Sequence, residues 1–127
     1  MRILIVDDSR AMRTIVIRTL RQAGWGEHTL EEASNGAEAL KIIEKAPVPD
    51  LVLSDWNMPE MTGIELLEEI KRRHIRVRFG FVTSEGSPDM RRRAMETGAL
   101  FLIAKPFTAD NFQTTLNAVF HKDPVIE

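Results

Sequence analysis

Four groups of polar side chains follow short apolar runs in this sequence, and their types suit phosphoryl chemistry. The groups are Asp7 with Asp8, then Asp55, Thr83 and Lys105. Carboxylate oxygens are ligands that Mg²⁺ prefers, and an aspartate can act as a nucleophile and become an aspartyl phosphate. A lysine and a threonine can bind phosphoryl oxygens, and phosphoryl transfer needs mainly positioning and neutralised charge. The residue types therefore predict a magnesium-assisted phosphoryl site with an aspartate as the acceptor.

Each of these residues taken alone carries little information. A single acid after a strand is usually a turn or helix-capping residue, and one threonine or lysine there means almost nothing. Three neighbouring carboxylates, however, repel one another and hold their pKa values high unless a cation lies among them. The combination at four strand ends favours the functional interpretation over the structural one.

The elements that must bring these side chains together alternate along the chain. Apolar runs predict five strands, at Ile3 to Val6, about Thr29 to Ala33, Leu51 to Leu53, Phe79 to Val82 and Leu100 to Ala104. Helical spacing predicts five helices, one from Ser9 to Gly24 with Met12, Ile15, Val16 and Leu20 on one stripe, and others over Gly36 to Lys45, Gly63 to Arg73, Ser87 to Gly98 and after Thr108. Continuously apolar strands indicate an α/β fold with a parallel sheet covered on both faces. Right-handed crossovers would place all of these polar groups at one edge of that sheet.

Composition narrows the class of protein further. The chain has 127 residues, which suits one domain, and a formal net charge of −2, which gives no global attraction to nucleic acid or anionic membranes. There is no cysteine, which fits a reduced cytoplasmic location and excludes a disulfide framework. No apolar segment approaches a membrane span. The basic run over residues 71–78 is interpreted as a helix end and an exposed connection, so we expect neither membrane insertion nor direct binding of nucleic acid.

Four motifs give the chain a family resemblance. They are ILIVDDS, LVLSDWNMPEMTG, FVTSE and AKPFT. With these motifs, the chain from Arg2 to about Phe120 resembles the response regulator receiver domains of two-component systems, and their CheY-like chemotaxis branch most of all. The resemblance implies a flavodoxin-like, doubly wound sheet of five parallel strands in the order 2-1-3-4-5 with five helices. It also implies a receiver domain over residues 1–121, with 122–127 as a tail or the start of a linker.

The resemblance assigns a role to each polar residue of the predicted site. Asp55 is the phosphoacceptor, Thr83 and Lys105 bind the phosphoryl oxygens, and the Lys105–Pro106 bond is cis. Mg²⁺ is bound by Asp8, the Asp55 carboxylate and the backbone carbonyl of Asn57, with Asp7 acting through a metal-bound water. Asn57 and Glu85 occupy the positions that tune the lifetime of the phosphorylated state. Trp56 is expected to be partly exposed beside the site.

The implied function is a phosphorylation-activated signalling switch and not a conventional enzyme. Its donor is the phosphohistidine of a sensor kinase, and small acyl phosphates can substitute for it. The face made by the predicted helix Ser87 to Gly98, the strand Leu100 to Ala104 and the helix after Thr108 is expected to bind a downstream protein. Leu102 stands at the switch position, three residues before Lys105, where the chemotaxis pattern has an aromatic residue.

Two other functions remain as alternatives. A magnesium-dependent phosphatase with an aspartate nucleophile usually carries Asp-x-Asp after its first strand, whereas this chain has Asp7, Asp8 and Ser9 there. A phosphate-independent binding module would not need the charged residues of the site, all of which are present. The run of three arginines at 91–93 is compatible with an acidic partner or with a solvated helix face.

Overall fold

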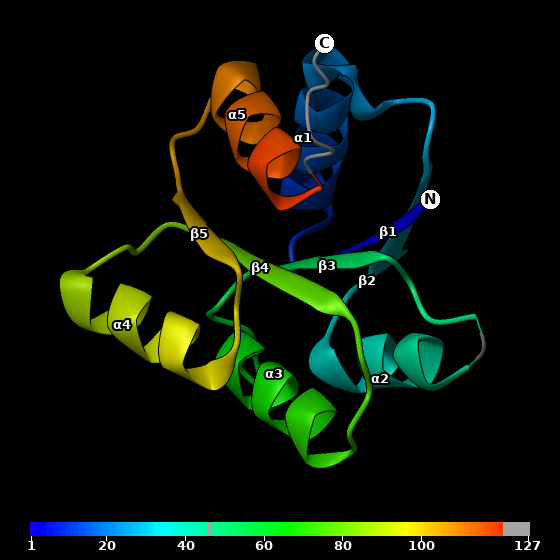
Figure 1. Ribbon diagram of the computed structural model, residues 1–127, viewed down its shortest axis with the longest axis vertical. Helices are drawn as coiled ribbons and strands as arrows, with labels where there is room; N and C mark the ends of the chain where they lie inside the picture. Colours follow the sequence, from blue (N-terminus) through cyan, green and yellow to red (C-terminus); the bar gives the residue numbers. More distant parts are fainter. Residues whose placement is uncertain (46, 121–127) are drawn as a thin grey trace, which may run out of the picture.

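The computed structural model describes residues 1–45 and 47–120, and its centre is a parallel sheet of five strands (Figure 1). The strands are β1 (Arg2–Val6), β2 (Thr29–Ala33), β3 (Leu51–Ser54), β4 (Arg78–Thr83) and β5 (Phe101–Ala104). Their order is β2-β1-β3-β4-β5, and every neighbouring pair is parallel. The flavodoxin-like order implied by the family resemblance is therefore confirmed. The predicted tail, 122–127, lies outside the described residues.

Helices follow the strands at the places that the sequence predicted. They are α1 (Arg10–Leu20), α2 (Gly36–Glu44), α3 (Gly63–Arg72), α4 (Pro88–Thr97) and α5 (Ala109–Val119), and a short π-helical turn, η1 (Arg21–Trp25), extends α1. Each α-helix begins after a polar capping side chain that accepts a hydrogen bond from a backbone N–H of the first turn, and these caps are Ser9, Asn35, Thr62, Ser87 and Thr108. Such caps satisfy N–H groups that the helix leaves without partners.

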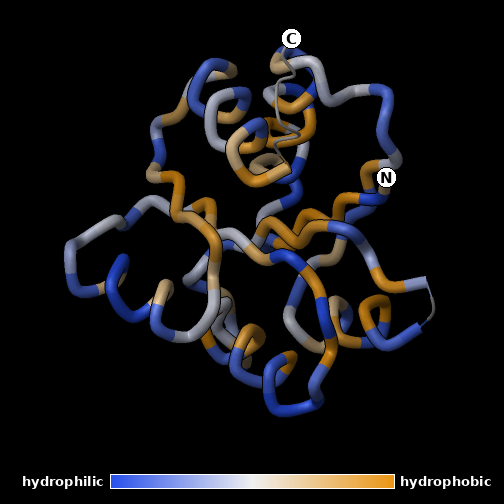
Figure 2. The backbone as a smooth tube through the Cα atoms, in the orientation of Figure 1, coloured by the Kyte–Doolittle hydropathy of each residue, from blue (hydrophilic) through white to orange (hydrophobic). Residues whose placement is uncertain are grey.

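The helices cover the two faces of the sheet as separate layers. Figure 1 shows α1 and α5 on one side and α2, α3 and α4 on the other. Successive strand residues point to opposite faces, so Phe101 packs in the core under α1 and α5 while Leu102 packs in the core under α2, α3 and α4. In Figure 2 the apolar colouring follows the strands and the inward sides of the helices. This two-sided burial explains the continuously apolar strand sequences.

One residue of the predicted apolar stripe of α1 is exposed to solvent. Ile15 is 42% exposed, whereas its neighbour Val16 is 2% exposed. Ile15 is rotated by about 100° around the helix from Val16, which faces the core, and so lies at the solvent-facing edge of the stripe. Within the apolar stripe, Val16 and Leu20 therefore carry the packing of α1, and Ile15 lies at its exposed edge.

The basic run over residues 71–78 behaves as the sequence suggested. It forms the last turn of α3, a largely exposed connection over residues 73–77 and the first residue of β4, Arg78. Lys71 and Arg72 lie in the final turn, where positive charge is favourable beside the unpaired carbonyls of a helix. None of the helices in the described part of the chain combines the length and apolar character needed to cross a membrane.

Candidate phosphoryl and metal site

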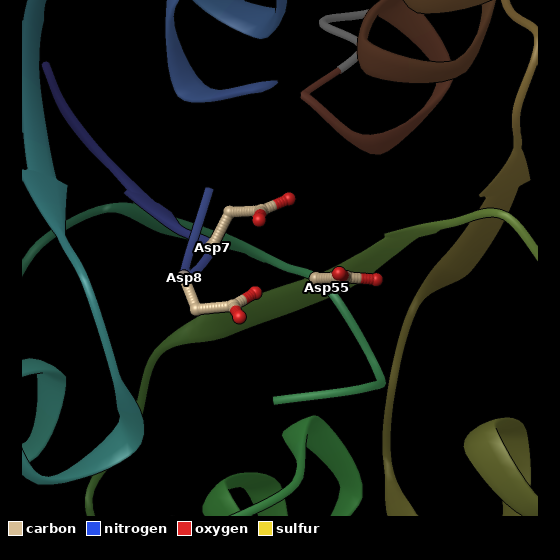
Figure 3. A group of neighbouring side chains, drawn as sticks. All are labelled: Asp7, Asp8 and Asp55. Carbon is tan, nitrogen blue, oxygen red and sulfur yellow. The ribbon is translucent and has the colours of Figure 1, made fainter. Parts of the chain in front are cut away.

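Three carboxylates meet at the carboxyl-terminal edge of the sheet (Figure 3). Asp7 and Asp8 follow β1, and Asp55 follows β3. One oxygen atom of each side chain lies within 4.8 Å of the corresponding atoms of the other two. The predicted cluster of acids is therefore present in the fold.

The pairing of β1 with β3 sets the positions of Asp7 and Asp55. Val6 is the partner of Ser54 in the parallel register, and the Asp55 N–H donates to the Val6 carbonyl at 2.9 Å. The two acids therefore leave adjacent strands side by side. The Asp7 carboxylate is oriented further by the Ser9 N–H, which donates to Asp7 Oδ1 at 2.9 Å.

The turn after β3 holds the Asp55 side chain from its own backbone. The Trp56 N–H donates to Asp55 Oδ1 at 2.8 Å, which limits rotation of the carboxylate. The Gly63 N–H then donates to the Trp56 carbonyl at 2.8 Å, so the first residue of α3 closes the turn. These two hydrogen bonds therefore hold the segment between β3 and α3 close to Asp55.

Lys105 and Thr83 complete the site from the two strands beyond β3. The Lys105 ammonium lies 3.6 Å from Asp7 Oδ2 and 4.0 Å from Asp55 Oδ2. Thr83 is fully buried at the end of β4, and its carbonyl accepts a hydrogen bond from the Lys105 N–H at 2.8 Å. The Lys105–Pro106 bond is cis, as the family resemblance implied. The ends of four elements thus converge on one small region.

The electrostatics of the site favour a bound cation. Burial raises the pKa of Asp55 above its ordinary value of 3.8, while the Lys105 ammonium and hydrogen bonds from Trp56 and Thr83 oppose this rise. Burial also raises the pKa of Asp7, against the opposing hydrogen bond from Ser9. In both groups desolvation of the charged form outweighs the local compensation. A dication beside these carboxylates would supply the missing positive charge.

The donor set fits Mg²⁺ in particular. Magnesium takes oxygen ligands, is often bound through one or two carboxylates and retains several waters. Here Asp8 is exposed and Asp55 is partly exposed, so one side of the acid cluster is open to solvent and to a phosphoryl group. Asn57 and Glu85 are exposed in the loops after β3 and β4, and their assigned roles remain predictions.

Trp56 differs from its expected position. The sequence suggested a partly exposed side chain, but Trp56 is only 8% exposed. Its ring lies against Phe81 of β4 with a centroid distance of 4.8 Å. The expectation was wrong because a residue from a neighbouring strand, distant in sequence, provides a packing surface that the local motif does not show.

Sequence reasoning also missed Arg13. The Arg13 guanidinium donates from Nη1 to the Asp7 carbonyl at 2.7 Å and from Nε to Glu32 Oε1 at 2.8 Å. It therefore ties α1 to the end of β1 and to β2 beside the acid cluster. Its position after ILIVDDS was the only available signal, and one arginine in a helix carries no specific information.

Comparison with known proteins gives a consistent result over most of the chain. Residues 3–117 match the family model described as the response regulator receiver domain. Chemotaxis protein CheY-3 of Vibrio cholerae is 37% identical over 126 residues, covering 96% of this chain and 93% of the relative. A CheY homolog of Campylobacter jejuni is 34% identical over 121 residues, covering 94% of this chain and 92% of the relative.

Solved structures show the same similarity. The chemotaxis protein CheY4 of Vibrio cholerae, crystallised at low pH, superposes with a TM-score of 0.80 at 34% identity. That match covers 93% of this chain and 97% of the other. A response regulator receiver domain protein from Clostridium thermocellum gives a TM-score of 0.79 at 29% identity, with 92% and 91% of the two chains covered.

Proposed function

The chain belongs to the response regulator receiver domain family, and we propose that it is a phosphorylation-activated signalling switch whose acceptor is Asp55. The observation that carries this proposal is the convergence of the Asp7, Asp8 and Asp55 carboxylates with the Lys105 ammonium. Receiver domains of the CheY type accept a phosphoryl group and act on downstream targets. This chain retains a charged residue at every position where that chemistry requires one.

In the proposed reaction an oxygen of Asp55 attacks the phosphorus of a phosphohistidine on a sensor kinase. The phosphorus–nitrogen bond breaks, the imidazole leaves and takes up a proton, and an aspartyl phosphate forms. Lys105 neutralises charge on the phosphoryl oxygens, and the Thr83 hydroxyl donates a hydrogen bond to one of them. The Trp56 N–H keeps the attacking carboxylate oriented.

A magnesium ion is the cofactor in this proposal. Asp8, the Asp55 carboxylate and the Asn57 carbonyl would hold it directly, and Asp7 would hold it through water. When bound, the ion compensates the charges of the carboxylates and the phosphoryl group. Asn57 and Glu85, which are exposed beside the ends of their strands, tune the access of water to the aspartyl phosphate.

We propose that the signal is passed to a downstream protein that binds the surface formed by α4, β5 and α5. A shift of Thr83 toward the phosphoryl group moves the loop that leads into α4, and Leu102 of β5 lies buried beneath that helix. A downstream protein that binds this surface would then distinguish the two states. The similarity to chemotaxis proteins favours such a pathway, with a cytoplasmic location beside the kinase.

Labelling with a small acyl phosphate tests the proposal directly. With Mg²⁺ and acetyl phosphate, intact mass spectrometry should show one added phosphoryl group, which disappears in Asp55→Asn. Asp110→Asn is a matched control because Asp110 is an exposed aspartate in the first turn of α5. It should be labelled like the unmodified chain.

The same measurement separates the proposal from a phosphatase. A dedicated phosphatase would release phosphate from generic phosphomonoesters over many turnovers, whereas the proposed switch holds one phosphoryl group per chain. If the unmodified protein gains no mass under conditions that label other receiver domains, the acceptor assignment is wrong.

A further inference from the structure

The Arg91 side chain connects three segments on the surface formed by α4, β5 and α5. Arg91 belongs to α4, and its Nη1 donates to the Leu102 carbonyl of β5 at 3.1 Å. Its Nε donates to the Gly86 carbonyl, in the loop between β4 and α4, at 3.3 Å. One guanidinium therefore links this loop to the edge strand of the sheet.

The contacts around Gly86 are close on both sides. A Cβ atom built on Gly86 would lie 3.2 Å from the Ala104 Cβ, 3.4 Å from Arg91 Nη2 and 3.5 Å from Leu102 Cδ2. The backbone of the loop thus packs against β5 and against the guanidinium together. A displacement of the loop at Gly86 must alter these contacts.

Arg91 differs from the two arginines that follow it. Arg92 pairs with Asp89 at 2.9 Å and Arg93 lies 3.7 Å from Glu68, so both bind carboxylates. Within residues 1–45 and 47–120, Arg91 makes no ion pair, and its side-chain hydrogen bonds go to backbone carbonyls. The run of three arginines is therefore neither uniformly solvated nor uniformly free for an acidic partner.

The loop that Arg91 holds begins at the site itself. Thr83 ends β4, and the Glu85 N–H donates to Thr83 Oγ1 at 3.4 Å. The Thr83 hydroxyl already donates to Asp55, so a displacement of Thr83 toward a phosphoryl group there would carry its Oγ1 along. The hydrogen bond from the Glu85 N–H and the backbone up to Gly86 would change with it. The Gly86 carbonyl would then move relative to Arg91.

We propose that Arg91 is a latch that holds the loop after β4 in its unphosphorylated arrangement and thereby couples it to β5. The proposal rests on the function proposed above. Arg91 is a positioning residue, since it acts through Gly86 and Leu102 and does not contact the acid cluster. Two hydrogen bonds from a charged donor favour the resting arrangement, so their loss shifts the population toward the arrangement that accepts the phosphoryl group.

The test compares Arg91→Ala with Arg92→Ala, an adjacent arginine whose bond is to a carboxylate. Hydrogen exchange of residues 84–87 is measured in the unphosphorylated protein, and labelling by acetyl phosphate is followed with Mg²⁺ present. We expect Arg91→Ala to exchange and to be labelled faster by about fivefold or more, while Arg92→Ala matches the unmodified chain. The exchange and labelling rates of Arg91→Lys should lie between those of Arg91→Ala and the unmodified chain, because an ammonium cannot make the two-pronged hydrogen bonds of a guanidinium.

Arg91→Lys also keeps the charge and the aliphatic stem of the side chain, so it can still be measured if Arg91→Ala is unstable. Equal exchange in the two alanine variants would overturn the latch, and so would slower labelling of Arg91→Ala, which would mean that Arg91 supports the accepting arrangement. The exchange measurement needs no phosphorylation. A chain that is never labelled at Asp55 would therefore refute the proposed function while the exchange data still decide whether Arg91 holds the loop.

Discussion

The backbone of Gly63 lies directly against the carbonyl oxygen of Asp55. A Cβ atom at Gly63 would lie 2.1 Å from that oxygen and 2.9 Å from the ring of Phe81. Since Gly63 is also the first residue of α3, the helix begins in contact with the peptide of the proposed acceptor. The position of α3 and the position of Asp55 are therefore linked through one close backbone approach.

Gly63→Ala should destabilise the protein because a rigid backbone atom occupies the space that the methyl group needs. We expect the free energy of unfolding to fall by about 1–3 kcal/mol, the usual cost of overpacking. Gly36→Ala is the matched control, since Gly36 also begins a helix, but its three nearest contacts are the Sδ, Cγ and Cβ atoms of the Met61 side chain and none is a backbone atom. Urea denaturation should show a smaller loss for Gly36→Ala, and equal losses would contradict the interpretation.

Asp7→Asn should stabilise the metal-free protein at neutral pH. Burial raises the pKa of Asp7 above its ordinary value of 3.8, so the folded chain holds this proton more tightly than the unfolded chain. The free energy of unfolding therefore falls as the pH rises from about 3.8 through the raised pKa of the folded state. Asparagine cannot ionise, and its Oδ1 can still accept the Ser9 N–H.

Urea denaturation without Mg²⁺ at a series of pH values measures this effect. The stability gain of Asp7→Asn should be present at pH 7 and should shrink toward zero as the pH approaches 3.8. Asp110→Asn, which changes an exposed carboxylate, is the control and should show no comparable trend. A gain that is the same at every pH would exclude ionisation of Asp7 as its cause.

Lys105→Gln should bind Mg²⁺ more tightly while accepting a phosphoryl group more slowly. The Lys105 ammonium lies 3.6 Å from Asp7 Oδ2 and 4.0 Å from Asp55 Oδ2, so it repels a dication bound by the same carboxylates. Removing it should strengthen Mg²⁺ affinity by about fivefold or more, given the size of charge interactions near a protein surface. Calorimetric titration provides the measurement, with Lys41→Gln, which changes an exposed lysine of α2, as the control. Weaker binding by Lys105→Gln would contradict the assigned competition.

Much of the fold and of the acid cluster was predictable because the signals are local. Ser87 followed by Pro88 marks the start of α4, and Gly98, with φ at 116°, ends it where a side chain would be strained. Apolar strands followed by acids indicate a site because parallel strands share one carboxyl edge. The sequence alone therefore predicts that Asp7 and Asp55 lie together.

The remaining parts depend on contacts between residues that are distant in sequence. Trp56 is buried because Phe81 of β4 lies beneath it, and Arg91 reaches the carbonyl of Leu102 in β5. The local sequence predicts neither contact, because a tryptophan at position 56 and an arginine at position 91 could each equally well be exposed to solvent. Packing across elements thus determines the surroundings of Trp56 and Arg91, whereas local patterns indicate the acid cluster.

Trp56 should report Mg²⁺ binding through its fluorescence. The backbone N–H of Trp56 donates to Asp55 Oδ1, and the Trp56 ring is buried. A dication at the acid cluster therefore changes the electric field at a chromophore that is shielded from solvent. Trp25 is the second tryptophan and packs against Phe120 in the other core cluster. We therefore expect a magnesium-dependent change that persists in Trp25→Phe and disappears in Trp56→Phe.

The same titration separates the proposed metal ligand Asp8 from the fluorophore. Asp8→Asn leaves Trp56 and its hydrogen bond to Asp55 in place but removes one carboxylate of the cluster, so the change should require higher Mg²⁺ concentrations. Glu65→Gln, in the first turn of α3 and outside the acid cluster, should titrate like the unmodified chain. If Asp8→Asn and the unmodified chain titrate identically, Asp8 is not a ligand, because a carboxylate that binds a hard dication cannot be replaced by an amide without loss of affinity.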